Sequence, residues 1–171
     1  MRIIRHRNIE QDDWRQLPES AAGAEVLDIP AGERVIVPLS ALQRNAEAIL
    51  CRTAPTGVLL RPADDVRELE PLLDRLCLVA IEFPAFNEGR GYSQARILRQ
   101  HYRFGGEIRA VGDVSRDRLA FMERCGFDAF VLRPGESPEA ALEAFTEISL
   151  RYQPAADAAP TIGDQRAAPG A

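Results

Sequence analysis

From residue 33 onward, short apolar runs alternate with longer stretches in which apolar residues recur at helical spacing. Five apolar runs are predicted as buried strands: Val35–Leu39, Gly57–Leu60, Leu78–Phe83, Ile108–Val111 and Ala129–Leu132. The stretches between and after them are predicted as helices: Ser40–Leu50, Asp64–Leu76, Ser93–Tyr102, Ser115–Cys125 and Ser137–Tyr152. Each predicted helix starts at a Ser or Asp, residues that favour the N-cap position.

Strands that alternate with helices indicate right-handed crossovers and a parallel sheet, so the fold class is α/β. The preferred architecture is an open three-layer sheet of about five parallel strands, doubly wound, with helices on both faces. The alternative is a partial β/α barrel, because the chain is too short to close with eight strands unless it dimerises. A homodimer is therefore left open.

The two ends of the chain differ from this pattern. Residues 2–5 and 25–29 are predicted as short strands of an antiparallel β preface around a polar stretch. The last residues, 153–171, are rich in Ala and Pro and are predicted to be disordered. The sequence thus predicts one α/β domain over residues 1–152, followed by a disordered tail.

Composition narrows the function classes. The formal net charge of −5 argues against general nucleic-acid binding, and every basic residue other than histidine is Arg. No apolar run approaches the length of a membrane span, so no membrane partner is expected. Cys51, Cys77 and Cys125 are isolated and lie at no ligand spacing from a His, which predicts a reducing compartment, the cytoplasm, and no metal site.

Candidate chemistry is expected at the carboxyl ends of the parallel strands, where loops and helix starts converge. The loop after the strand 78–83 turns through two glycines around Arg90 and reaches a predicted helix start at Ser93. Backbone N–H groups at such a start, beside a guanidinium, suit an anion. Arg90, Gly91, Tyr92 and Ser93 are therefore candidate anion-binding residues. An ion pair of Arg90 with a neighbouring carboxylate is the structural alternative.

Further charged residues are predicted at the same end of the sheet. Arg61 and Arg133 each follow a strand in a similar Leu-Arg-Pro context, and Glu82 and Asp113 lie at the ends of two other strands. Together they could form an anion pocket in which Glu82 or Asp113 moves protons, or a network of ion pairs without catalytic function.

Signatures of common cofactor sites are missing from the sequence. We find no GxGxxG after the first strand, no GxxxxGK[ST] and no GxSxG. No cofactor is therefore indicated by motif. Flavin binding within a doubly wound sheet remains a weaker alternative.

Three motifs carry a family resemblance. They are Ile81-Glu82-Phe83-Pro84-x-Phe86-x-x-Gly89-Arg90-Gly91-Tyr92-Ser93-x-Ala95-Arg96, then Gly106-Glu107-Ile108-Arg109-Ala110-Val111-Gly112-Asp113-Val114, and Met122-x-Arg124-Cys125-Gly126-Phe127-Asp128-Ala129-Phe130. Together they resemble the bacterial domain-of-unknown-function family 934 over roughly residues 2–152.

The resemblance implies a role in sulfur assimilation. Genes of this family commonly lie beside the haemoprotein subunit of assimilatory sulfite reductase, and members often carry the label of oxidoreductase. The first hypothesis is an accessory protein that assists this subunit or its electron donor. The second is an α/β enzyme, an oxidoreductase among others, that binds a small anion at the carboxyl ends of its strands.

Overall fold

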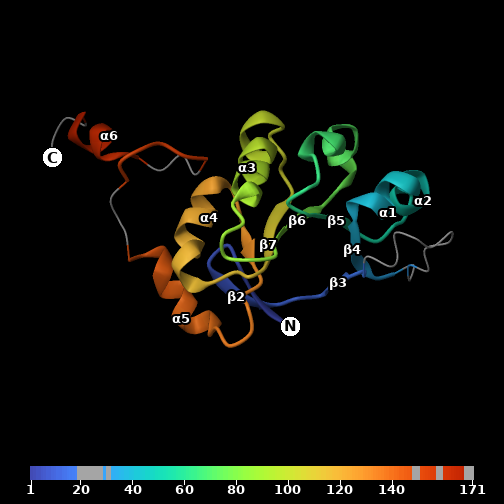
Figure 1. The fold of residues 1–171 in the computed structure, drawn as a ribbon, viewed down its shortest axis with the longest axis horizontal. Coiled ribbons are helices and arrows are strands. Elements are labelled where there is room, and N and C mark those ends of the chain that lie inside the picture. The colour runs from blue at the N-terminus through green and yellow to red at the C-terminus, as the bar shows by residue number, and fades with distance from the viewer. Residues whose placement is uncertain (19–28, 30–31, 148–150, 157–159, 168–171) are drawn as a thin grey trace.

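One strongly curled sheet determines the architecture of the protein. The computed structural model describes residues 1–18, 29, 32–147, 151–156 and 160–167. These residues form a sheet of eight strands in the order β2-β1-β8-β7-β6-β5-β4-β3. Figure 1 shows this sheet at the centre of the molecule, with the helices arranged around it.

The parallel part of the sheet follows the predicted strands closely. It consists of β4 (Arg34–Pro38), β5 (Thr56–Leu60), β6 (Leu78–Phe83), β7 (Glu107–Gly112) and β8 (Ala129–Phe130). Each of these strands pairs in parallel with the strand that precedes it along the chain. The mixed α/β class and the parallel pairing are confirmed.

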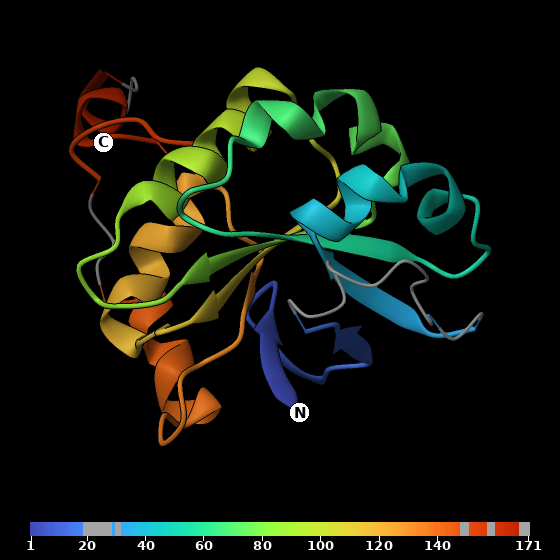
Figure 2. The ribbon, with the colours of Figure 1, turned by 45° about the vertical axis from the view of Figure 1, so that its right-hand side comes forward.

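The predicted three-layer, doubly wound sheet is wrong, because the strand order runs in one direction. Right-handed crossovers between successive neighbours all pass over the same face, so the helices gather on that face. Figure 2 shows α1–α3 over one face of the central parallel strands, with the N-terminal strands of the same sheet (blue) curling round toward the other face. The architecture is instead a partial β/α barrel, which was the alternative prediction. Its sheet has more strands than the five expected.

The additional strands come from the N-terminal segment. β1 (Arg2–Arg5) and β2 (Asn8–Gln11) form a hairpin, and β1 also pairs antiparallel with β8. β3 (Trp14–Gln16) pairs in parallel with β4 at the opposite edge. The strand predicted at 25–29 lies almost wholly outside the described residues. Neither β2 nor β3 was expected.

The two edges of the sheet are joined covalently. β2 is the strand at one edge, β3 is the strand at the other, and only Asp12 and Asp13 separate them. Three Cα–Cα steps reach at most about 11 Å, so the edges must approach each other at this link. The sheet is therefore curled into a partial barrel with an inner and an outer face.

The helical segments are shorter and less regular than predicted. They are α1 (Leu39–Arg44), α2 (Ala46–Leu50), η2 (Val66–Arg75), α3 (Arg90–Arg96), η3 (Ile97–His101), η4 (Arg116–Arg118), α4 (Leu119–Cys125), α5 (Pro138–Leu142) and η5 (Glu143–Phe145). η2 is a 3₁₀-helix that contains Pro71, and η3 is a π-helical turn that continues α3.

N-caps differ from the predictions at most helices. Ser137 accepts a hydrogen bond from the backbone N–H of Ala140 (3.4 Å), as predicted. In η2 the cap is Asp65 instead of Asp64. α1 and α3 begin before Ser40 and Ser93, and Ser115 makes no side-chain capping bond.

A short helix, α6 (Ile162–Ala167), lies within the predicted tail, and the disorder of the rest of this tail stays a prediction. Among the described residues, no helix combines the length and the apolar character needed to cross a bilayer.

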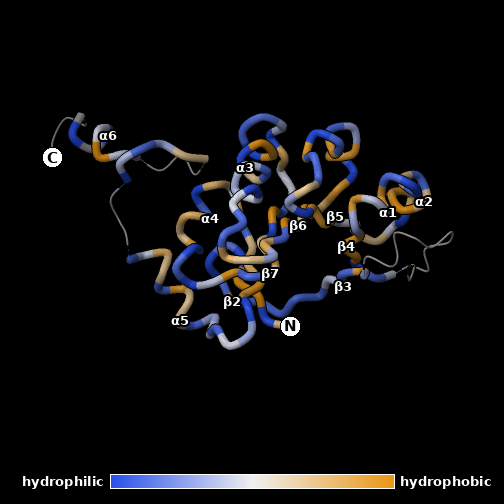
Figure 3. The backbone as a smooth tube through the Cα atoms, in the orientation of Figure 1, coloured by the Kyte–Doolittle hydropathy of each residue, from blue (hydrophilic) through white to orange (hydrophobic). Residues whose placement is uncertain are grey.

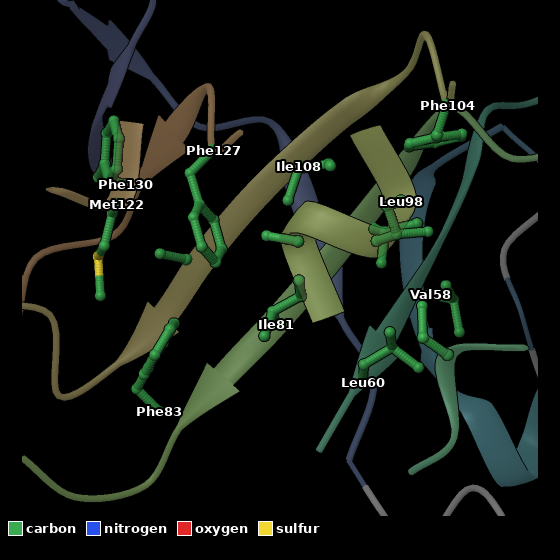
Figure 4. Close-up of a cluster of buried hydrophobic side chains, with 14 of the residues drawn as sticks. Val58, Leu60, Ile81, Phe83, Leu98, Phe104, Ile108, Met122, Phe127 and Phe130 are labelled. Carbon is green, nitrogen blue, oxygen red and sulfur yellow. The ribbon is translucent and has the colours of Figure 1, made fainter. Parts of the chain in front are cut away.

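The main hydrophobic core lies between the outer face of the sheet and the helices. Strand positions alternate between the two faces, so Val79, Ile81 and Phe83 of β6 point to this core. Figure 4 shows Ile81 and Phe83 on the same side as Leu98 of η3, and Figure 3 shows hydrophobic residues concentrated along the central strands. A smaller apolar cluster covers the inner face: Ile36, Leu59, Leu78, Ala80 and Val111.

A chain of ion pairs ties the N-terminal strands to the inner face. Arg109 of β7, whose side chain is 2% exposed, donates through Nη1 to both Asp12 oxygens (3.0 and 3.1 Å). Its Nε donates to Glu107 (2.7 Å), whose other oxygen accepts from Arg5 (2.8 Å). Arg5 also pairs with Glu10 of β2. We call these five residues the inner ion-pair chain. Burial opposes the charged form of Arg5, but Glu107 and Glu10 outweigh it and raise its pKa.

Removal of Arg109 should destabilise the fold. An Arg109→Met substitution keeps most of the side-chain volume but leaves Asp12 without a cation and Glu107 with Arg5 alone, and we expect a loss of about 3–5 kcal/mol of unfolding free energy. Urea denaturation measures this change. The matched control is Arg15→Met, which removes the exposed pair with Glu33 (3.1 Å) and should cost about 0–1 kcal/mol. If both variants unfolded at the same urea concentration, a central role for the inner ion-pair chain would be contradicted.

Candidate functional site

The carboxyl ends of the parallel strands lie along one rim of the partial barrel. Glu82 is the penultimate residue of β6, and Arg61, Asp113 and Arg133 follow β5, β7 and β8. Because neighbouring parallel strands end at the same edge, the loops that carry these residues converge, as predicted from the sequence. The structure joins the four charged side chains into two pairs.

The first rim pair connects β5 and β6. Arg61 Nε lies 3.5 Å from Glu82 Oε2, and the side chains are 43% and 31% exposed. The turn that carries Arg61 is held by Asp64, which accepts from the Arg61 backbone N–H (2.7 Å). The buried Gln94 of α3 donates to the Arg61 and Asp64 carbonyls (2.9 and 3.0 Å). The position of Arg61 is therefore fixed through its backbone.

The second rim pair connects β7 and β8. Asp113 Oδ1 lies 3.3 Å from Arg133 Nη1, and Arg133 also contacts Glu136 (3.0 Å). Hydrogen bonds to Asp113 and then to Glu136 raise the pKa of Arg133. Gly112 directs this turn: its φ is +93°, and a Cβ there would lie 2.4 Å from the Phe83 carbonyl oxygen. Asp113 serves in ion pairs and makes no capping bond.

The loop around Arg90 differs from the prediction. α3 begins at Arg90, three residues before the predicted helix start at Ser93. The Tyr92 N–H is already bonded to the Gly89 carbonyl (3.2 Å), and Ser93 is exposed. Arg90, 64% exposed, donates two side-chain hydrogen bonds to Glu88 (3.0 and 2.8 Å). The structural alternative of an Arg90 ion pair is thus present, and anion binding by this loop stays a prediction.

Gly91 and Tyr92 of this loop have packing roles. A Cβ on Gly91 would lie 2.7 Å from Phe83 Cζ and 2.9 Å from Ile81 Cγ2, so α3 approaches β6 more closely than a side chain would permit. The Tyr92 ring lies 5.1 Å from the rings of both Phe83 and Phe121. Burial raises the pKa of Tyr92, with Arg118 acting in the opposite direction.

An aromatic cluster extends from Tyr92 in two directions: to Phe121 on one side, and through the buried Phe83 and Arg118 to Phe86 on the other. The buried Arg118 guanidinium lies over the Phe83 ring (5.6 Å) and over the Phe86 ring (5.3 Å). Phe121, Tyr92, Phe83, Arg118 and Phe86 therefore form one continuous series of contacts. Its two ends, Phe86 and Phe121, are 67% and 56% exposed. We call this series the aromatic ridge.

A cavity of about 310 Å³ lies on the inner face of the sheet. Its lining comes from the N-terminal segment, from β3, β4, β6 and β7, and from the residue after β8: Met1, Asp12, Trp14, Gln16, Ile36, Glu82, Arg109, Val111, Gly112 and Val131. Glu82 is the one candidate site residue that lines it. The guanidinium of Arg109 lies 6.0 Å from the centre of the Trp14 ring. We call this space the inner cavity.

Sequence reasoning missed Arg109, Arg118 and Phe121. Arg109 had a detectable signal, because Glu107 and Arg109 alternate with apolar residues in a strand that is otherwise buried, which indicates a charged inner face. Phe121 lies on the exposed side of α4, out of phase with the buried Leu119 and Met122. Arg118 gave no signal, since its burial depends on the loop that carries Phe86.

No residues suited to metal binding gather in the described part of the chain: it contains no group of three or more His, Cys, Asp or Glu that could hold an ion. Cys51 and Cys77 are exposed, and Cys125 is buried in the main core.

Comparison with known proteins gives one family. The model of DUF934, described as a bacterial protein of unknown function, matches residues 57–162. The match begins in β5 and includes both rim pairs and the aromatic ridge, whereas β1–β4 precede it. No curated protein matches the chain.

Substitution of Gly91 should test its packing role. Gly91→Ala should destabilise the protein by about 1–3 kcal/mol, because the new methyl group overlaps Phe83 and Ile81. The matched control is Gly89→Ala, two residues earlier, where nothing lies within 4 Å of the added Cβ. Thermal unfolding distinguishes them, and a Gly91→Ala protein as stable as the Gly89→Ala control would exclude the close packing.

The Glu88–Arg90 pair should be visible in an acid titration. Arg90 hydrogen bonds lower the Glu88 pKa from 4.5 to about 2, so the pair stabilises the fold above pH 4.5 and loses its effect as the pH falls toward 2. Arg90→Ala should return the Glu88 pKa toward 4.5, and Arg96→Ala should not. Carboxyl carbon NMR measures the Glu88 pKa in both variants. An unchanged Glu88 titration in Arg90→Ala would show that the pair does not form in solution.

Proposed function

The chain belongs to the DUF934 family, and we propose that it is an accessory protein of assimilatory sulfite reduction, which docks on the sulfite reductase haemoprotein subunit or on its electron donor. The family resemblance supports the pathway. The aromatic ridge supports docking, and it is the single structural observation on which this proposal rests.

The composition of the ridge is typical of protein interfaces. Aromatic residues and Arg are enriched at interface centres and account for much of the binding energy. Phe86 and Phe121 are among the most exposed large hydrophobic residues of the described chain, and each packs on a less exposed neighbour, Arg118 or Tyr92. Side chains held by such contacts before binding lose less conformational entropy on binding.

Charge contributes to the choice of partner. The net charge of −5 favours encounter with a basic surface, since opposite potentials accelerate association. The partner we propose therefore presents an apolar pocket for the aromatic ridge and carries a net positive charge.

A second candidate function is a small-molecule enzyme or binding protein, an oxidoreductase among others, with its site at the carboxyl ends of the strands. The inner cavity favours it, because the cavity includes Glu82 and Gly112 at the ends of β6 and β7. In this function Glu82 or Asp113 would move protons, and Arg61, Arg90 and Arg133 would attract a small anion such as sulfite to the rim.

A growth assay tests the docking proposal. A deletion strain should fail on sulfate and on sulfite as sole sulfur source and grow on sulfide and on cysteine. A gene with Phe86→Ser and Phe121→Ser should fail to restore growth, and a gene with Tyr152→Ser should restore it, because Tyr152 is 84% exposed and lies outside the ridge.

Affinity measurements connect this growth phenotype to docking. With purified haemoprotein subunit and electron donor, the double variant should bind its partner at least about tenfold more weakly than the wild type, the effect of losing one interface anchor. Normal growth on all four sulfur sources in a strain without a redundant system would refute the pathway. A double variant that binds and complements normally would refute the role of the ridge.

A further inference from the structure

The inner cavity has the size and chemistry of a small-molecule site. Its volume of about 310 Å³ is at the lower end of known ligand pockets, which are typically apolar with a few polar groups that fix orientation. Ile36, Val111 and Val131 provide apolar walls, and Trp14 adds an aromatic surface.

Arg109 supplies an unsatisfied donor in this cavity. Two of its three nitrogens are occupied, Nη1 by Asp12 and Nε by Glu107. Its Nη2 is buried and has no hydrogen-bond acceptor within the part of the chain that the structure describes. A buried N–H group without an acceptor is unfavourable, so an acceptor oxygen supplied by a ligand would be stabilised here.

The charges of the cavity select against a free anion. The positive charge of Arg109 is already balanced by Asp12 and Glu107, so little net attraction remains for an anion at Nη2. A dianion there would in addition be repelled by these carboxylates. A suitable ligand therefore carries a compensating positive charge beside its acceptor oxygen.

Glu82 is positioned to receive that positive charge. In the register of β6 and β7, Glu82 lies opposite Val111 and Arg109 lies opposite Ala80, so both point inward and are offset by two residues. Strand spacing places their Cα atoms about 8 Å apart, with Glu82 nearer the carboxyl rim. The contact of Glu82 with Arg61 is long, 3.5 Å, and at least partly open to solvent.

We propose that the inner cavity binds a small zwitterion that carries a carboxylate and an ammonium group, the charge pattern of a free amino acid. The carboxylate accepts a hydrogen bond from Arg109 Nη2, the ammonium group donates to Glu82, and the apolar part of the ligand contacts Trp14 and Val111. This inference names the ligand class of the second candidate function. It does not depend on docking through the aromatic ridge.

Trp14 makes the proposal directly measurable. It is the single tryptophan of the chain, it lines the cavity, and it lies beside the Arg109 guanidinium. Because Nη2 is itself buried, a ligand oxygen reaches it only when a lining side chain moves. Binding should therefore change the fluorescence of Trp14.

The experiment is a fluorescence titration of the full chain with each free L-amino acid. Sodium acetate, sodium sulfite and ethylamine serve as probes that carry one kind of charge only. We expect a saturable change with at least one amino acid and at least tenfold weaker responses to the single-charge probes. Glu82→Gln should weaken the binding of that amino acid roughly tenfold, the effect of losing one charge-assisted contact. Glu70→Gln, at an exposed carboxylate of η2, should leave it unchanged.

Several results would overturn the proposal. They are the absence of a saturable change with any amino acid, a response to sulfite or acetate as strong as that to the zwitterion, or identical binding by Glu82→Gln and wild type.

A second variant, Val131→Phe, fills the cavity from its wall and should abolish the response. The growth and partner-binding assays use Phe86 and Phe121 on the outer surface, so failure of one proposal is distinguishable from failure of the other.

Discussion

The two-residue link between β2 and β3 is the constraint on which the rest of the structure depends. It joins the opposite edges of the sheet, so the sheet must curl, and the curl creates an inner face that charged residues of the N-terminal segment can reach. Asp12 lies in this link and is bonded to Arg109 at the middle of β7. One residue thus both joins the edges and supplies a carboxylate to the inner ion-pair chain. The inner cavity exists because this closure leaves space between β3 and the central strands.

Most individual elements could be predicted from the sequence, whereas their arrangement could not. The five parallel strands were located to within about two residues, because buried strands are continuous apolar runs. The order of the strands is not encoded in local periodicity, so the sequence pattern could not distinguish an open sheet from a partial barrel. β2 and β3 are short and polar, and β3 pairs with β4, which lies about 20 residues further along the chain. The start of α3 was misplaced because Ser93 suggested a cap, whereas Gly91 already lies in the first turn of the helix, packed against Phe83.

Only part of the candidate site could be predicted from the sequence, because local patterns locate the strand ends but not the contacts between side chains. Strand ends converge in any parallel sheet, so the rim position of Arg61, Glu82, Asp113 and Arg133 followed from the strand predictions alone. Which of them pair, and the burial of Arg109 and Arg118, depend on tertiary packing. The alternation of β6 has a further effect that only the structure reveals: Glu82 points into the inner cavity, and the next residue, Phe83, points into the aromatic ridge. A ligand would contact Glu82, whereas Phe83, which is fully buried, supports the exposed Phe86 through Arg118.

The closure of the sheet also bears on the behaviour of the protein at high concentration. A strand at the edge of an open sheet exposes unpaired backbone groups, which invite strands of other molecules and lead to aggregation. Here β2 and β3, the two edge strands of the described sheet, meet at Asp12 and Asp13 and carry short, polar sequences. At this link Asp12 is buried against Arg109, and Asp13 pairs with Arg34 of β4 (2.9 Å), so charged side chains lie where the two edges meet. The link that shapes the inner face therefore also protects the sheet from edge-to-edge growth.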